Sequence, residues 1–98
     1  MIERIECKIS DEKSNYDYLR WIKRVADRFK VVGAVFTNDD GSIEVVAEGE
    51  DEVLTKFSKH MMDGHPIFNM ISIVDNFAMK WHKATGEYKD FQVLNKKT

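Results

Sequence analysis

Hydrophobic and charged residues alternate near the start of the chain. Ile5, Cys7 and Ile9 are separated from one another by single charged residues. A period of two places these three side chains on one face of an extended strand, so the segment predicts a half-buried β-strand. The apolar residues that follow recur every three or four positions, which predicts an amphipathic helix over residues 15–30. The apolar face of this helix comprises Leu19, Ile22, Val25, Ala26 and Phe29.

The middle of the chain predicts a β-hairpin. Two apolar strand segments cover residues 32–37 and 43–48. Between them, residues 38–41 have the sequence Asn-Asp-Asp-Gly, whose members tolerate positive φ angles and favour tight turns. We therefore expect two neighbouring antiparallel strands joined by this turn.

A second helix and two more strands are predicted after the hairpin. Asp51 is a suitable N-cap for this helix, and Gly64 followed by Pro66 is typical of a helix end. A long strand is expected over residues 71–81, and a short one around residues 91–93. The apolar stripe of the second helix comprises Leu54, Phe57 and Met61.

The order of these elements is strand, helix, strand, strand, helix, strand, with one further strand at the end. It predicts an α+β fold of the ferredoxin-like, split β-α-β type, in which an antiparallel sheet of four to five strands carries two helices on one face. We expect one domain over residues 1–98, with its core within about residues 2–94 and a polar tail at residues 95–98. The core is expected to include Ile5, Cys7, Ile9, Leu19, Ile22, Ala26, Val35, Leu54, Phe57 and Phe77.

Composition agrees with a globular domain and argues against several classes of partner. With 43% hydrophobic and 33% charged residues, the 98-residue chain can build one core. A net charge of −2 argues against nucleic acid as a partner, and the apolar runs are too short to cross a membrane. The first residues lack the basic head and apolar stretch of a signal peptide, so we expect the protein in the cytoplasm.

Few side chains are candidates for a catalytic nucleophile or a metal ligand. Cys7 is the only cysteine and shares its phase with the apolar residues of the first strand, so we expect a buried and unreactive thiol. His60, His65 and His82 fall in different predicted elements and lack cysteine or carboxylate partners at ligand spacing. We therefore expect neither a metal nor a cofactor.

The first predicted helix carries two further groups of residues. A basic cluster interrupted by Asp27 is typical of a solvated helix face. An aromatic cluster near the start of the helix either packs into the core or forms an apolar contact surface. The basic residues are Lys23, Arg24, Arg28 and Lys30, and the aromatic residues are Tyr16, Tyr18 and Trp21.

Two separated motifs resemble the acylphosphatase family, and together they cover about residues 5–94. The central motif, GAVFTNDDGSIEVVAEGEDEV at residues 33–53, keeps the family's spacing without an insertion. The second motif, WHKATGEYKDFQV at residues 81–93, matches the family's closing pattern. The shared positions are Gly33, Val35, Asp40, Gly41, Ser42, Glu48 and Gly49 in the first motif, and Trp81, Thr85, Gly86, Glu87, Tyr88 and Phe91 in the second.

The resemblance implies hydrolysis of acyl phosphates without a metal or cofactor, but the implied catalytic residues are absent. In the family a glycine-rich loop cradles the phosphate, an arginine grips its oxygens, and an asparagine orients the attacking water. The aligned loop here, residues 13–19, has no glycine, and glycines are needed for a concave anion nest. Leu19 stands at the arginine position and Thr37 at the asparagine position, while Asp17 would repel a phosphate.

Two hypotheses follow from these substitutions. The first is a catalytically degenerate domain that serves as a binding or structural module for an unknown protein or small-molecule partner. The alternative is a working acylphosphatase that cleaves carboxyl-phosphate bonds with Arg20 and Asn38, which follow the two expected positions directly and keep the family's spacing of eighteen. This alternative requires a local bulge near Asn38, whereas Thr37 could hold a water only weakly. An RNA-binding domain of the same strand order is disfavoured by the acidic charge.

The segment that replaces the glycine-rich loop predicts an early helix start. Ser14 as N-cap, with Asp17 three residues later, resembles a weak capping box. We therefore expect the first helix to begin at about Asn15, with Tyr16 and Tyr18 covering the place where the family binds phosphate.

Overall fold

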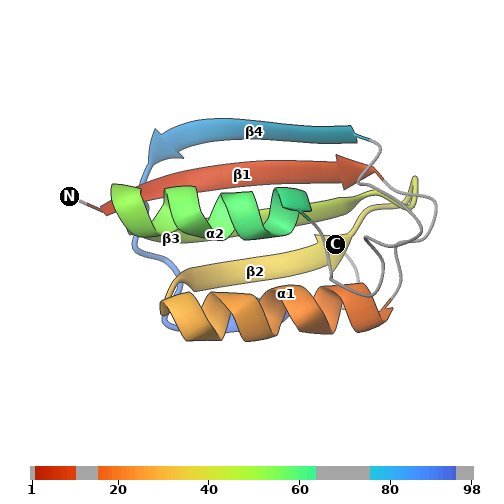
Figure 1. Cartoon of the computed structure of the whole chain (residues 1–98), viewed down its shortest axis with the longest axis horizontal. Helices are drawn as coiled ribbons and strands as arrows, with labels where there is room; N and C mark the ends of the chain where they lie inside the picture. Colours follow the sequence, from red (N-terminus) through yellow and green to blue (C-terminus); the bar gives the residue numbers. More distant parts are fainter. Residues whose placement is uncertain (1, 11–15, 64–75, 95–98) are drawn as a thin grey trace.

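A computed structural model of the chain describes residues 2–10, 16–63 and 76–94. Within these ranges two layers are visible, one a twisted sheet and the other a pair of helices (Figure 1). The elements are β1 (Ile2–Ser10), α1 (Tyr16–Phe29), β2 (Val32–Thr37), β3 (Ile43–Glu50), α2 (Asp51–Asp63), β4 (Asn76–Lys83) and β5 (Phe91–Val93).

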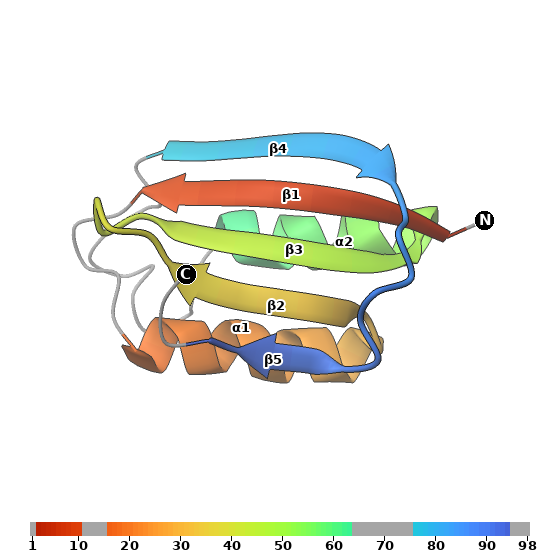
Figure 2. The same ribbon diagram turned by 180° about the vertical axis from the view of Figure 1, so that it is seen from behind.

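The strands form one mixed sheet in the order β4-β1-β3-β2-β5. The first four strands pair antiparallel, with β1 between β3 and β4. The predicted ferredoxin-like fold is therefore confirmed. One feature differs from the prediction, because β5 pairs parallel to β2. The chain leaves β4, crosses the end of the sheet and enters β5 beside the first residues of β2, so both strands run in the same direction (Figure 2).

Both helices lie on the same face of the sheet, as predicted (Figures 1 and 2). Helix α1 contacts β2 and β5, whereas α2 contacts β1 and β3, and the two helices also touch each other. The core lies between the layers, and apolar burial of this kind is the main stabilising contribution to the fold. The predicted core residues are buried wherever their side chains are described, and Phe77 falls outside that part of the structure.

A smaller apolar cluster lies on the opposite, helix-free face of the sheet. Ala34 and Phe36 of β2 pack there with Val46 of β3, and Tyr88 of the β4–β5 connection packs against them. The side chains of Arg4, Glu6, Lys8 and Glu44 have the same phase on β1 and β3, so this face is otherwise polar.

Element boundaries agree with the predicted ones to within a few residues where they are described. Strand β4 extends to Lys83, two residues beyond the predicted end, and α2 starts at Asp51 itself. Other boundary predictions concern residues that the structure does not describe. These are the helix start at Ser14 and Asn15, the helix end at Gly64 and Pro66, residues 71–75, and the tail at residues 95–98.

Gly33 allows β2 and β3 to approach each other closely at the start of the hairpin. Its φ angle is 148°, a conformation that side-chain-bearing residues rarely adopt. A Cβ atom at this position would overlap the carbonyl oxygen of Val46, a backbone atom that cannot move aside. The Gly33 N–H also donates a hydrogen bond to the Asp90 carbonyl oxygen at 2.9 Å, which ties β2 to the start of β5. Gly41, in the turn, has a positive φ of 87° but open space around it.

We expect Gly33→Ala to lower the free energy of unfolding by about 3 kcal/mol or more, because a backbone overlap adds to the cost of positive φ. Gly41→Ala makes the same chemical change at positive φ without an overlap, so about 1–2 kcal/mol is expected there. Urea unfolding of both variants measures the difference. Equal losses in the two variants would contradict the role given to the β2–β3 contact.

Candidate functional site

Leu19 and Thr37, which align with the family's catalytic arginine and asparagine, lie at one end of the molecule. The end of β2, the start of β3 and the first turn of α1 all face this end (Figures 1 and 2). Thr37 is the last residue of β2 and pairs with Ile43, and Asn38 follows it in the turn. The pairing from Val32 to Thr37 is continuous, without the bulge that a shifted position for Asn38 requires.

The side chain of Asn38 is engaged within the turn. Its amide nitrogen donates hydrogen bonds to Ser42 Oγ at 3.0 Å and to Glu44 Oε1 at 3.2 Å. The backbone N–H of Asn38 donates to the Ser42 carbonyl oxygen at 2.8 Å. Both amide hydrogens of Asn38 are therefore used to fix the hairpin.

Asp40 stabilises the same turn as an acceptor. Its carboxylate receives hydrogen bonds from the hydroxyl and the backbone N–H of Ser42, at 2.6 and 2.9 Å. The Ser42 hydroxyl, followed by its backbone N–H, lowers the pKa of Asp40. Lys8 lies 3.6 Å away, so a cation is already paired with this carboxylate. These contacts favour the charged carboxylate of Asp40 and fix it within the hairpin turn.

The first turns of α1 contribute core residues rather than ligands. Leu19, at the expected arginine position, is 4% exposed and belongs to the main core cluster. Tyr18 is 3% exposed, and its hydroxyl lies 3.4 Å from the carbonyl oxygen of Met61 in α2. The Tyr18 ring stacks on Trp21, with ring centroids 5.6 Å apart, and Trp21 packs against the core. Core packing is therefore the role of these two aromatic residues, and the Tyr16 side chain lies outside the described structure.

Arg20 lies one residue beyond Leu19 on α1 and is exposed. One residue turns an α-helix by about 100°, so Leu19 and Arg20 cannot both face the core. The structure therefore brings Thr37 and Asn38 together on the hairpin, while Arg20 belongs to the outer surface of α1.

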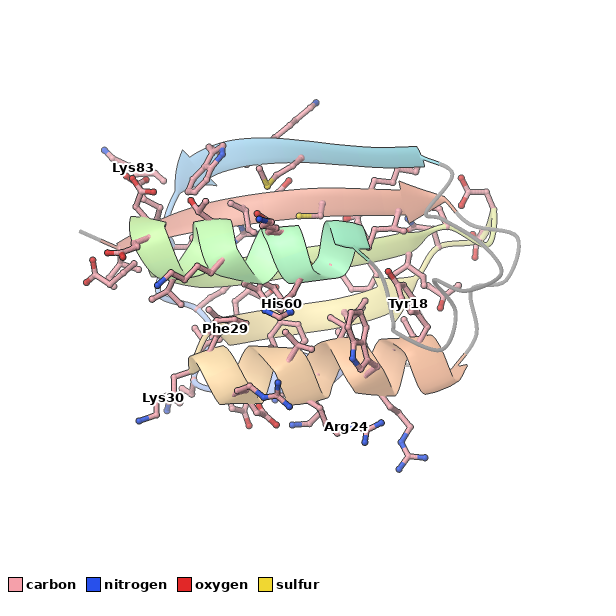
Figure 3. All side chains as sticks on the ribbon, viewed as in Figure 1. Tyr18, Arg24, Phe29, Lys30, His60 and Lys83 are labelled. Atoms are coloured by element: carbon pink, nitrogen blue, oxygen red, sulfur yellow. The ribbon has the colours of Figure 1, made fainter. Side chains whose placement is uncertain are left out.

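Three members of the basic cluster, Arg24, Arg28 and Lys30, are exposed, as predicted for a solvated helix face, and Lys23 is half-buried. Lys23 forms an ion pair with Asp27 at 2.8 Å, one turn further along α1. The side chains of Arg24 and Lys30 extend outward on the side of α1 that faces away from α2 (Figure 3).

A second polar centre, which the sequence pattern did not predict, lies at the other end of the sheet. The Glu48 side chain is only 2% exposed. Its carboxylate accepts hydrogen bonds from the backbone N–H groups of Thr85 and Gly86 at 2.8 and 3.0 Å, and from the Thr85 hydroxyl at 2.9 Å. Arg4 approaches the same carboxylate at 3.3 Å.

Arg4 links this buried carboxylate to the β4–β5 connection. Its guanidinium also donates to Glu87 at 2.7 Å and to Glu6 at 3.1 Å, and it lies 5.9 Å from the centre of the Tyr88 ring. Burial alone raises the pKa of Glu48, but the hydrogen bonds from Thr85, Gly86 and Arg4 outweigh it and hold the pKa below its ordinary value. The arrangement leaves Glu48 no hydrogen-bonding capacity for a ligand, so its role is structural.

Within the described ranges, the other reactive groups do not converge on a catalytic arrangement. Cys7 is buried, and burial raises the pKa of its thiol to about 12, so the predicted unreactive thiol is protonated at neutral pH. His60 packs against Phe29, with ring centroids 5.1 Å apart (Figure 3). His82 lies 3.5 Å from Glu6, and His65 falls outside the described residues. In the described part of the chain, no three histidine, cysteine or acidic residues are grouped to hold a metal, and no helix could span a membrane.

A hollow of about 810 Å³ lies beside the start of α2. Its lining includes four carboxylates from β1, β3 and α2, with Lys56 as a cation. An acidic lining repels a phosphate group, so this hollow is not a substitute for the missing cradle. The four acidic residues are Glu3, Glu50, Asp51 and Glu52.

Comparisons of the sequence with known proteins identify one family. A family model described as Acylphosphatase matches residues 14–93. An acylphosphatase of Pseudothermotoga lettingae is 32% identical over 88 residues, covering 89% of this chain and 92% of that protein. An acylphosphatase of Bacillus velezensis is 34% identical over 65 residues, covering 64% of this chain and 72% of that protein. The crystal structure of acylphosphatase from Bacillus subtilis superposes with a TM-score of 0.82 at 21% identity, over 94% of this chain and 98% of that one, and so shares its fold.

We expect Glu48→Gln to lower the free energy of unfolding at pH 7 by about 2–4 kcal/mol, because an amide cannot accept all of these hydrogen bonds. The folded-state pKa of Glu48 lies below the unfolded value of about 4.3, so its stabilisation is complete above that pH and is lost as the pH falls through the folded pKa. The difference between wild type and variant should therefore shrink in acid.

Urea unfolding at a series of pH values from 7 to below 4 measures this dependence. Glu52→Gln is the matched control, because its exposed pair with Lys56 at 3.7 Å contributes less than about 1 kcal/mol. A Glu48→Gln variant as stable as this control at pH 7 would contradict the structural role of Glu48.

Proposed function

This chain belongs to the acylphosphatase family, and we propose that it is a binding or structural module in which acyl-phosphate hydrolysis has been lost. The observation that carries the proposal is the burial of Leu19, which is 4% exposed in the core cluster. At the position where the family needs a cation to hold phosphate, this chain has an apolar residue that faces away from solvent. A leucine side chain at this position gives a phosphate dianion no electrostatic stabilisation.

The expected loss of catalytic rate supports the proposal. Removing a single donor from a charge-stabilising catalytic centre costs about 10²–10³ in rate. Here the arginine is replaced by Leu19, the asparagine by Thr37, and the loop at residues 13–19 contains no glycine. Such effects do not simply add, but together they remove the groups on which catalysis by positioning and electrostatics depends.

The hairpin turn also favours loss of catalysis. The amide of Asn38 already donates to Ser42 and Glu44, so it must break both bonds before it can orient a water.

The alternative is an acylphosphatase that uses Arg20 and Asn38 in adapted geometry. It requires Arg20 to reach from the outer surface of α1 toward the hairpin, and it requires Asn38 to leave the turn. Family membership and the retained spacing of eighteen residues favour this alternative, and Arg20 is the residue on which it depends. The resemblance implies that hydrolysis in this alternative needs no metal or cofactor.

We expect hydrolysis of benzoyl phosphate at least about 10³-fold slower in kcat/KM than that of the Pseudothermotoga lettingae acylphosphatase under the same conditions. Arg20→Ala should leave the residual rate unchanged. Arg24→Ala is the matched control, since it removes an exposed arginine one turn further along α1. Turnover comparable to that of the relative, abolished in Arg20→Ala but kept in Arg24→Ala, would overturn the proposal and establish the adapted enzyme.

A further inference from the structure

Among the described residues, strand β4 has one edge that pairs with no other strand. It is the outermost strand of the sheet and has eight residues, whereas β5, at the other edge, has three. Among the described residues β4 pairs only with β1, and nothing lies beyond it in either view (Figures 1 and 2). A strand edge of this kind offers backbone N–H and C=O groups to a further strand.

The helix-side face of β4 carries an exposed apolar strip. Trp81 is paired with Ile5 and Met79 with Cys7, and paired residues of neighbouring strands point to the same face. Met79 is half-buried against the core, but Trp81, further along the strand, is 43% exposed. An aromatic side chain with this exposure beside an open edge is available for contact with a partner.

Two lysines and a histidine accompany this strip. Lys80 and His82 alternate with Trp81 and therefore lie on the helix-free face, and Lys83 ends the strand (Figure 3). All three are exposed, and within the described ranges neither lysine forms an ion pair. The neighbouring strand β1 already places one carboxylate beside these basic side chains, since Glu6 lies 3.5 Å from His82.

We propose that the β4 edge binds an extended acidic segment of a partner protein, which joins the sheet as an added strand. Backbone hydrogen bonds hold such a segment, and its side chains alternate between the two faces. Apolar side chains on one face cover Trp81 and Met79, while carboxylates on the other face meet Lys80 and His82. The inference rests on the proposed binding function and identifies the chemistry of its partner.

A second copy of this chain fits the edge less well. Antiparallel pairing of two β4 strands centred on Lys80 places the Lys80 side chains of the two copies opposite each other, and like charges on facing strands are destabilising. Lysines on an edge strand commonly prevent this self-association. The same charges attract a segment that carries carboxylates at alternate positions.

The test uses the exposed tryptophan as its reporter. Trp21→Phe leaves Trp81 as the sole tryptophan of the chain. The probe is a capped peptide, Thr-Val-Glu-Thr-Glu-Val-Glu-Thr, with an otherwise identical peptide containing lysine in place of glutamate as its control. The acidic peptide should shift the Trp81 emission to shorter wavelength in a saturable manner, and the basic peptide should not. No shift with the acidic peptide, or equal shifts with both, overturns the proposal.

Two N-methylated forms of the acidic peptide distinguish strand addition from charge attraction alone. N-methylation of alternate residues blocks the hydrogen bonds of one peptide edge and leaves the other edge intact. One form should keep its affinity, and the other should lose about ten-fold or more, since several hydrogen bonds are removed together. Equal affinity of the two forms contradicts binding at a strand edge.

Charge variants locate the contact on the protein. Lys80→Glu should weaken binding of the acidic peptide about ten-fold, whereas Lys56→Glu, an exposed lysine of α2, should change it less than about two-fold. Equal effects of the two variants, or a concentration-dependent dimer of the wild type in sedimentation, count against the proposal. These outcomes do not depend on acyl-phosphate hydrolysis, so an active enzyme that binds the peptide refutes only the loss of catalysis.

Discussion

The fold depends on how the chain crosses from β4 to β5. The two strands lie at opposite edges of the sheet, four inter-strand spacings apart, which is roughly 19 Å at about 4.8 Å per spacing. The connection from Lys83 to Phe91 spans at most about 28 Å when fully extended, so it has little slack. Glu48, on the central strand β3, holds this connection midway through Thr85 and Gly86.

The hydrogen bonds from Thr85 and Gly86 to Glu48, here called the clamp, fix the β4–β5 connection to the central strand of the sheet. The clamp allows β5 to enter beside β2 and places Phe91, which is 2% exposed, under α1 and α2. Phe91 packs edge-on against Phe57 with ring centroids 6.1 Å apart, so the last strand completes the core. Because the clamp lies at the far end from the hairpin turn, the chain can keep the family's fold while the residues near the turn diverge. Leu19 illustrates this independence, since it contributes to the core from the position where the family places a catalytic cation.

Periodicity predicted the helices, the strands and most of the core, because each depends on residues close in sequence. Ile5, Cys7 and Ile9 are buried for the same reason that their spacing suggested. The parallel pairing of β5 could not be predicted in this way, because it depends on the path of a connection rather than on local pattern. The role of Glu48 was hidden for a similar reason. Its partner Thr85 is 37 residues away, and its strand phase is shared with the solvent-side Glu44.

For the candidate catalytic positions, the sequence alone identified the residues to compare, and the structure added their contacts. It identified Leu19 and Thr37 as departures from the family and Arg20 and Asn38 as neighbours of the expected positions. It did not predict that the Asn38 amide would be used by Ser42 and Glu44, because hydrogen bonds within a turn depend on its backbone conformation. These hydrogen bonds bear on whether Arg20 and Asn38 could take the place of the family's arginine and asparagine.

An amide-resolved NMR titration with inorganic phosphate examines whether this chain has lost the family's phosphate-binding centre. At millimolar phosphate and constant ionic strength, we expect no saturable chemical-shift change at residues 13–20 or 37–38. Saturable changes concentrated at those residues, and absent from the β4 edge, would contradict this loss.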